Sequence, residues 1–512
     1  MAADRPSAPL TAGRGGQSLA LAVLCTLLFL TFLDSTIVSV VLGDVQSSLH
    51  ADIADLQWVV CAYTLTFASI MLACGMIGDE LGRKKVMLAG VGVFCAGSVL
   101  CAVAPNAQVL IAGRAVMGLG AAASEPGTLS MLRQLFPDAK ERSRAIGVWA
   151  ATSGFALAAG PLIGGILAGL WNWRAIFWFN LVFGLAVLIV AALIIPESAD
   201  PSAARVDTAG TLLGAGALGT LVFGIIDAET SGFASSLVIA LFCVSVVLIV
   251  AFILWERRAA YPLLDLRYFR VAAFSTGNIA AFCTYFATFA IFFFTALYLV
   301  EVSGASGYKL ALVFLPMTVL MIGSSLLAGR WTAVVGPRWS IALGCLLFAA
   351  GLLLTSVYLK PHPDYGPLVV ALALAGIGIG TTVVPITSSV MSAVPAERSG
   401  MAASMANTSR VIGAATGVAL LGSLVNSQLS SRLISQMNHI GVPKGFQQEV
   451  ITALETAQIP KTMAFGAIEQ EVINAAYAAF QDALQVALYL SAALALAAGV
   501  LAVITLRTGR QA

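Results

Sequence analysis

The sequence predicts an all-α polytopic membrane protein with a 6 + 2 + 6 arrangement of transmembrane helices. Three observations support this fold class: the composition, the number of long apolar runs, and an internal repeat. Of the 512 residues, 59% are hydrophobic and 10% are charged, whereas an ordinary soluble domain has about 25% charged residues. This composition excludes a soluble enzyme, a disordered chain and a nucleic-acid partner, and the net charge of +2 provides no polyanion-binding surface.

Long apolar runs give the number of helices. A helix needs about 20 apolar residues to cross the roughly 30 Å hydrocarbon core of a bilayer. Fourteen such runs predict transmembrane helices at residues 18–42, 56–77, 86–104, 107–132, 145–169, 174–195, 208–227, 235–255, 272–300, 308–328, 339–358, 367–391, 401–426 and 481–505. The first run is too long for the apolar region of a signal peptide, and we expect it to remain as a helix.

The positions of lysine and arginine predict the orientation. With the N-terminus inside, 19 of the 27 basic residues fall in inner segments, 6 fall in outer ones, and Arg114 and Arg410 lie within helices. This bias follows the positive-inside rule. We therefore expect a protein of the cytoplasmic (inner) membrane with cytoplasmic tails at 1–17 and 506–512, and an external connection at 427–480.

Three signatures recur at a nearly constant distance along the chain. The pair Gly75 and Gly82 is echoed by Gly329 and Gly336, at an offset of 254 residues. The motif at 126–130 recurs after 259 residues, and the triplet at 141–143 recurs after 256. A parallel repeat indicates two bundles related by an axis along the membrane normal. We expect pseudo-symmetric six-helix bundles at 18–195 and 272–505, separated by an inserted helix pair with its flanking loops at 196–271, and a central cavity between the bundles.

Charged residues inside predicted helices are the first functional candidates. A carboxylate near the bilayer centre costs about 2.5–3.5 kcal/mol on insertion scales, so such residues usually face a cavity or a partner. Asp34 lies deep in the first helix, and Arg114 and Glu125 share one face of the fourth. Asp34 and Arg114 lie at similar depth and can pair. Proton coupling is one interpretation of all three residues, and static contacts between helices are the other.

Several other features have structural as well as functional interpretations. The segment 75–85 is expected to be a short inner loop, with Asp79 stabilising the start of the third helix through its dipole. The segment 160–165 is expected to kink the fifth helix and to let a neighbouring helix approach. Aromatic residues of the ninth helix, among them Phe286 and Phe289, lie on one face and either bind a flat lipophilic ligand or face lipid.

The cysteines and histidines do not suggest a metal site. The eight cysteines lie in apolar stretches without a CxxC pair, and the three histidines lie in polar connections. We therefore expect buried, unpaired thiols and no metal or haem.

At these motifs the chain resembles the major facilitator superfamily, and within it the fourteen-span branch of drug:proton antiporters, over nearly its whole length. The most specific match is the superfamily's conformational loop motif, here Gly75, Asp79, Gly82, Arg83 and Lys84. The resemblance implies a protonation site at Asp34 and a role in proton coupling for Arg114. Two departures stand out: Met117 replaces an expected glutamine, and Glu125 replaces a more common apolar residue.

The same resemblance extends to substrate binding and direction. Tyr63 follows the branch's second-helix pattern, and with Asp34, Glu125, Phe286 and Phe289 it is expected to line the substrate cavity. The antiporter motif of the fifth helix is matched by Gly154, Gly160, Pro161, Gly164 and Gly165, and it favours export.

The sequence therefore predicts a monomeric, proton-driven exporter of lipophilic compounds, including cationic ones, that works by alternating access. Its expected partners are the small lipophilic substrate, protons and membrane lipids, with the proton gradient as energy source and no cofactor. Three alternatives remain: an exporter of an endogenous lipid, siderophore or secondary metabolite, a proton-coupled importer, and an intramembrane enzyme. The sequence lacks the features that an intramembrane enzyme would need, because it contains neither an HExxH motif nor paired acids at one depth.

Overall fold

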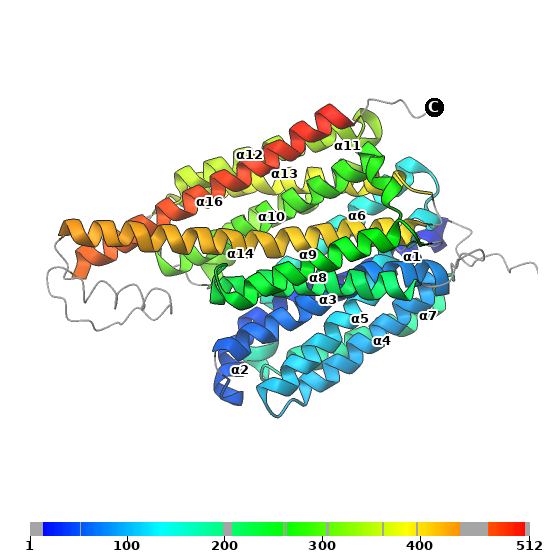
Figure 1. Cartoon of the computed structure of the whole chain (residues 1–512), viewed down its shortest axis with the longest axis horizontal. Helices are drawn as coiled ribbons and strands as arrows, with labels where there is room; N and C mark the ends of the chain where they lie inside the picture. The colour runs from blue at the N-terminus through cyan, green and yellow to red at the C-terminus, as the bar shows by residue number, and fades with distance from the viewer. Residues whose placement is uncertain are drawn as a thin grey trace, which may run out of the picture.

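The structure is a computed structural model that describes residues 14–51, 53–197, 207–259, 262, 264–303, 307–360, 363–395, 398–440 and 469–506. Long α-helices run roughly along its longest axis (Figure 1). In chain order the elements are α1 (Arg14–Ile37), the 3-10 helix η1 (Val38–Val41), α2 (Leu42–Leu49), α3 (Ile53–Leu81), α4 (Arg83–Ala102), α5 (Ala107–Leu135), α6 (Ala139–Leu170), α7 (Ala175–Ile194), α8 (Thr208–Ser231), α9 (Ser236–Glu256), the 3-10 helix η2 (Leu266–Arg270), α10 (Ala272–Glu301), α11 (Gly307–Val335), α12 (Pro337–Tyr358), α13 (Tyr365–Ser392), α14 (Ser399–Ile440) and α16 (Glu469–Thr505).

Helical segments cover the fourteen predicted spans, although in the first, 18–42, α1 ends at Ile37 and η1 and the start of α2 cover the rest. Within the described ranges, thirteen helices are long and apolar enough to cross a membrane. The remaining one, α6, packs along α1 and α11 and stays helical through residues 160–165, where a kink and a close approach of a neighbouring helix are predicted. The protein is thus a multi-pass, all-α membrane protein with the predicted 6 + 2 + 6 order.

The predicted external connection at 427–480 is helical at both of its ends. Helix α14 continues to Ile440 and α16 begins at Glu469. The two helices project beyond the rest of the bundle (Figure 1) and are joined by an ion pair between Arg432 and Asp482. Hydropathy locates the edge of the bilayer, whereas a helix can continue into water with polar side chains. The central part of this connection, 441–468, lies outside the described residues.

The internal repeat reappears as repeated packing. Helices α4 and α5 cross where Gly90 faces Gly120: a Cβ on Gly90 would lie 2.7 Å from the Gly120 carbonyl oxygen. Helices α12 and α13 cross in the same way, because a Cβ on Gly344 would lie 3.0 Å from the Gly378 carbonyl oxygen. Such small residues let helix backbones approach closely within a membrane. The same local sequence therefore builds the same crossing in each half.

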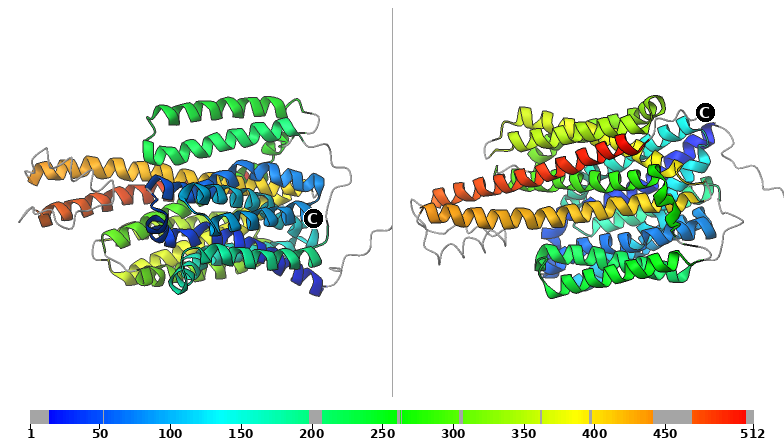
Figure 2. Two further views of the ribbon diagram at one scale, coloured as in Figure 1. Left: turned by 90° about the horizontal axis from the view of Figure 1, so that it is seen from below. Right: turned by 45° about the horizontal axis from the view of Figure 1, so that its top comes forward.

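The inserted pair lies against the seam between the two halves. Helices α8 and α9 pack on each other, and α8 also packs on α3 of the first half and α14 of the second. Figure 2 shows the pair on the outside of the bundle. Asp207 caps the start of α8, since its side chain accepts a hydrogen bond from the Gly210 N–H at 2.9 Å.

Candidate functional site

The predicted pairing of Asp34 with Arg114 is present in the structure. Arg114 Nη1 lies 2.5 Å from Asp34 Oδ2, and both side chains are at most 1% exposed. Arg114 Nε also donates to the Val59 carbonyl at 3.0 Å, and its guanidinium lies 4.6 Å from the centre of the Tyr63 ring. Helices α1, α3 and α5 thus hold a charged pair in the interior of the first half. The attraction between two opposite charges at this depth offsets the energetic cost of removing each charge from water.

The sequence analysis missed a third member of this cluster. Asn180 of α7 is fully buried, and its Nδ2 donates to Asp34 Oδ1 at 2.6 Å. Each carboxylate oxygen of Asp34 therefore has a donor. A signal was present in the sequence, because Asn180 is the one polar side chain between Ala175 and Ile194. A lone amide in an otherwise apolar membrane helix needs a buried partner.

Tyr63 and Met117 complete the surroundings of the pair. The Tyr63 hydroxyl donates to the Thr31 carbonyl at 3.1 Å, which holds its ring against Arg114. At the position where the resemblance favours glutamine, Met117 places its sulfur 4.0 Å from Arg114 Nη1. Thioether sulfur is a weak acceptor, so Arg114 depends mainly on Asp34 and the Val59 carbonyl. In this conformation Tyr63 packs within the first half.

Glu125 lies in different surroundings from Asp34. It is 3% exposed, and its Oε2 has no hydrogen-bond partner among the described residues. It is coupled electrostatically to Arg410 of α14, in the second half, and the two residues form no ion pair within the described part of the chain. Arg410 donates to Asn407 Oδ1 at 2.7 Å and to Thr387 Oγ1. Glu125 thus lies on the first half and Arg410 on the second, without a hydrogen bond between them in the described residues.

The conformational loop motif is not a loop. Helix α3 continues to Leu81 and α4 begins at Arg83, so Gly82 alone forms the turn, with φ +111°. Its counterpart Gly336, with φ +87°, forms the turn between α11 and α12. Glycine reaches positive φ without the steric cost that a side chain would bring. The prediction of a loop over 75–81 is wrong, because Asp79 and Arg83 form buried contacts and the helix therefore continues past them.

Asp79 caps a different helix from the one predicted. Its carboxylate accepts hydrogen bonds from the backbone N–H groups of Gly400 and Met401, each at 3.1 Å, in the first turn of α14. Arg83 pairs with the same carboxylate at 2.6 Å. At the start of α4 the Glu197 carboxylate instead accepts a hydrogen bond from the Lys84 N–H at 3.2 Å. Asp79 therefore joins the first half to the second.

A second contact between the halves repeats this arrangement. Gly75 of α3 packs against the backbone of Gly400 in α14, and Gly329 of α11 packs against the backbone of Ser143 in α6. The Ser143 hydroxyl donates to the Gly329 carbonyl at 3.0 Å. We call the end of the bundle that carries Gly82, Gly336 and these contacts the Gly82 end. The two halves are closed against each other there.

The glycines of the antiporter motif have separate roles. Gly154 packs on Met321 of α11 across the seam. Gly160 and Gly164 pack on the end of α1, where a Cβ on Gly164 would lie 2.8 Å from the Ile37 carbonyl oxygen. Gly165 has no atom within 4 Å of its Cβ position, and the side chain of Pro161 lies outside the described part of the chain.

The predicted aromatic face is only partly visible. Phe286 is 3% exposed, its backbone lies against Gly417 of α14 and its ring lies against that of Phe282, so in this conformation it belongs to the interior of the second half. The side chain of Phe289 lies outside the described residues. The ring of Tyr285 lies 5.6 Å from the Arg410 guanidinium, and this contact was not predicted.

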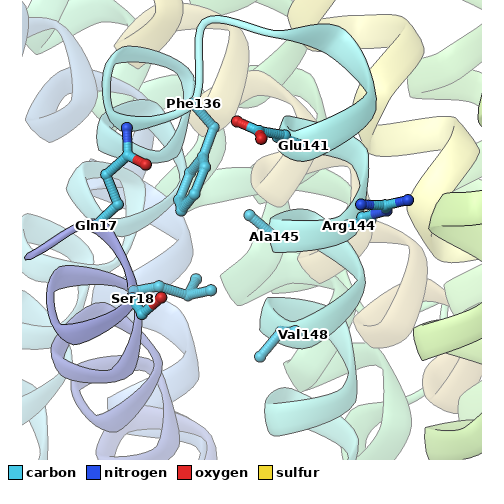
Figure 3. Close-up of a pocket in the computed structure, with 8 residues that line it drawn as sticks. Gln17, Ser18, Phe136, Glu141, Arg144, Ala145 and Val148 are labelled. Atoms are coloured by element: carbon cyan, nitrogen blue, oxygen red, sulfur yellow. The ribbon is translucent and has the colours of Figure 1, made fainter. Parts of the chain in front are cut away.

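A pocket of about 250 Å³ lies at the Gly82 end of the first half. It is lined by Gln17 and Ser18 of α1, Phe136, and Glu141 and Arg144 of α6, among others (Figure 3). The Gln17 amide closes one side by donating to the Leu135 carbonyl at 3.0 Å. None of the predicted site residues lines this pocket, so it is distinct from both charge clusters.

Comparisons with known proteins agree with this architecture. The profile described as "Major Facilitator Superfamily" matches residues 24–418. Similar proteins are the multidrug resistance protein Stp of Mycobacterium tuberculosis (35% identical, 83% of this chain and 79% of the relative), the methylenomycin A resistance protein of Bacillus subtilis (36%, 79% and 87%) and the tetracenomycin C resistance and export protein of Streptomyces glaucescens (30%, 89% and 85%).

Solved structures share the fold at much lower identity. The human organic anion transporter MFSD10 has a TM-score of 0.63 and 14% identity, with 97% of this chain and 100% of that chain covered. A bacterial homologue of the lysosomal transporter Spinster, inward-facing and unoccupied, has a TM-score of 0.57 and 18% identity at 97% and 100% coverage. With its repeated halves, its paired seam contacts and these relatives, the chain belongs to the Major Facilitator Superfamily.

Proposed function

We propose that the protein is a proton-coupled antiporter that exports lipophilic drugs or other toxic compounds across the cytoplasmic membrane by alternating access. The observation that carries the proposal is the fully buried Asp34–Arg114 pair with Asn180. A carboxylate held by a guanidinium and an amide is an acid whose protonation changes the forces between three helices. Protonation would neutralise Asp34 and weaken its hold on Arg114.

The direction of transport is supported by the relatives. The relatives are named for multidrug resistance, methylenomycin A resistance, and tetracenomycin C resistance and export. We place the Gly82 end and both termini in the cytoplasm, following the positive-inside count. The contacts at Asp79 and Ser143 then close the cytoplasmic side. Rocking of the two halves would expose the seam to each side in turn.

The energy source and assembly follow from the same proposal. A proton gradient drives the cycle, a monomer surrounded by lipid carries it out, and no cofactor or enzymatic step is needed. Because Asp34 is fully buried here, proton release requires a second conformation that gives water a path to it. A secondary-metabolite exporter is the second candidate, favoured by the relatives named for methylenomycin A and tetracenomycin C.

The test is efflux from proteoliposomes with an imposed pH gradient. Asp34→Asn preserves the shape of the side chain and removes the charge, and we expect gradient-driven efflux to fall by at least about tenfold, the effect of roughly 1.4 kcal/mol. Asp44→Asn is the matched control, because Asp44 is an exposed acid that follows shortly after α1 in the chain. Full gradient-driven efflux in Asp34→Asn would remove Asp34 from the mechanism.

A further inference from the structure

Arg410 lies between aromatic rings from both halves of the protein. Its guanidinium lies 5.5 Å from the centre of the Trp149 ring of α6 and 5.6 Å from that of Tyr285 in α10. Trp149 is held in place because its indole N–H donates to Thr128 Oγ1 at 3.0 Å. The guanidinium is thus placed at the seam by both halves, and the rings beside it are rigid, flat and apolar.

Arg410 forms no ion pair with any residue that the structure describes. Its two hydrogen-bond acceptors, Asn407 Oδ1 and Thr387 Oγ1, are neutral. Within the described part of the chain, the ion pairs are those of Asp79, Asp34, Asp265 and Asp482 with neighbouring arginines, and Arg410 is not among them. Glu125 is near enough to act on Arg410 electrostatically but does not form such a pair.

Each half contributes a buried polar atom that has no hydrogen bond to the residues that the structure describes. They are Glu125 Oε2 on the first half and Asn407 Nδ2 on the second, each in a residue at most 3% exposed. Leaving a buried polar atom unsatisfied costs about 1–3 kcal/mol, so such atoms call for an explanation. A ligand that brings its own donor and acceptor to the seam would satisfy them.

We propose that Arg410 and Glu125 form a substrate site for amphoteric aromatic compounds, in which an anionic oxygen binds Arg410, a cationic or N–H group binds Glu125, and the ring system lies against Trp149 and Tyr285. This inference rests on the proposed export function and narrows its substrate class. A guanidinium binds a carboxylate through two parallel hydrogen bonds, and its flat neighbours suit an aromatic ring.

The opposite charges also define what the site rejects. A purely cationic compound bound at Glu125 would approach Arg410 without neutralising it, and a purely anionic compound would meet Glu125. Unfavourable charges of this kind discriminate between ligands as effectively as good contacts do. A cationic group on the substrate also competes with a proton for Glu125, as exchange of substrate for protons requires.

The test compares two dyes that differ only in one charge. Rhodamine B has a cationic ring system and a free carboxylate, and in its ethyl ester the carboxylate is blocked. Binding to the detergent-solubilised full-length protein is followed by fluorescence anisotropy of each dye. We expect the wild type to bind the acid at least about tenfold more tightly than the ester, the effect of one charge-assisted hydrogen bond. Lipophilicity favours the ester, so a preference for the acid cannot arise from it.

Variants assign this preference to residues. Arg410→Gln should abolish the preference for the acid while leaving binding of the ester unchanged or stronger. Arg410→Lys, which retains the charge but loses the two-pronged geometry, should keep part of it. Glu125→Gln should weaken both dyes and keep their ratio. Arg432→Gln is the control on the same helix, because Arg432 lies in the projecting part of α14 and pairs with Asp482.

Two results would overturn the inference: equal or tighter binding of the ester by the wild type, or a preserved preference for the acid in Arg410→Gln. If Arg410→Gln does not fold, the comparison of the two dyes on the wild type still decides. Binding is measured without a gradient, so the outcome is separate from proton coupling. Loss of gradient-driven efflux with an intact preference for the acid would contradict the proposed export function alone.

Discussion

The contact of Asp79 with α14 predicts how firmly the Gly82 end stays closed. Asp79→Asn retains an acceptor oxygen but removes the negative charge that faces the Gly400 and Met401 N–H groups. Hydrogen bonds to a charged group contribute about 1.5–3 kcal/mol, against about 1 kcal/mol for neutral ones. The interaction of the carboxylate with the start of α14 adds about 0.3–1 kcal/mol. A loss of about 2 kcal/mol is therefore expected, and it would raise the open fraction roughly 30-fold.

Ser404 provides a probe for this opening. It is fully buried on α14 and faces Gly75 of α3 across the seam. In a protein whose eight native cysteines are replaced by alanine, Ser404→Cys should react with a membrane-impermeant maleimide only when the seam opens. Labelling from the Gly82 side, in inside-out vesicles, should accelerate roughly 30-fold in Asp79→Asn.

The control and the contrary result are equally concrete. Asp44→Asn removes an exposed acid in the short helix α2 and should leave the labelling rate unchanged. If the Asp79→Asn protein is labelled at the wild-type rate, and Ser404→Cys still reacts fully after denaturation, then Asp79 does not hold the two halves together.

Three further predictions concern stability in detergent. Gly90→Ala should lower the free energy of unfolding by about 1–3 kcal/mol, since its Cβ would lie 2.7 Å from the Gly120 carbonyl oxygen. Gly92→Ala is the control and should have little effect, because no described atom lies within 4 Å of its Cβ position. Equal melting temperatures of the two variants would contradict this packing. Asn180→Leu removes a donor to buried Asp34 and should cost about 1.5–3 kcal/mol; an unchanged melting temperature would show that this hydrogen bond contributes little. Arg267 donates hydrogen bonds to Asp265 between α9 and α10 and so lowers the pKa of that carboxyl. The ionised Asp265 carboxylate therefore stabilises the fold at pH values above its usual pKa of about 3.9, and this stabilisation is lost as the pH falls through its lower pKa in the folded protein. Asp265→Asn should remove this part of the acid dependence of the melting temperature.

Much of the fold was predictable because hydropathy and charge act over whole helices. Helical segments cover the fourteen runs, and the repeat correctly paired the Gly82 and Gly336 turns. Helix ends were not predictable in the same way. Residues 75–81 stay helical because Asp79 and Arg83 find buried partners, and α14 continues to Ile440 although its last turns are polar.

The candidate sites were predictable only in part, and the reason is physical. The Asp34–Arg114 pair follows from two charges at equal depth, which need each other in a low-dielectric interior. The electrostatic coupling of Arg410 to Glu125 could not be deduced, because the two residues lie on helices from opposite halves. Sequence spacing along one helix carries no information about which helices of the two bundles meet.

The repeat shows where the chemistry must lie, because the buried charges are the places where the halves differ. The offset of 258 between Gly120 and Gly378 places Leu372 opposite Arg114, and a valine, Val383 or Val384, opposite Glu125. By the offset of 256 between Ser143 and Ser399, Arg410 corresponds to Gly154. The shared glycines build crossings and seams that can rock in either direction, so they cannot by themselves couple that motion to protons or substrate. A buried charge is costly in either half, and a symmetric pair of charges would double that cost without giving the two halves different responses. The asymmetric residues are therefore the ones that can make one conformation depend on a proton and the other on a ligand.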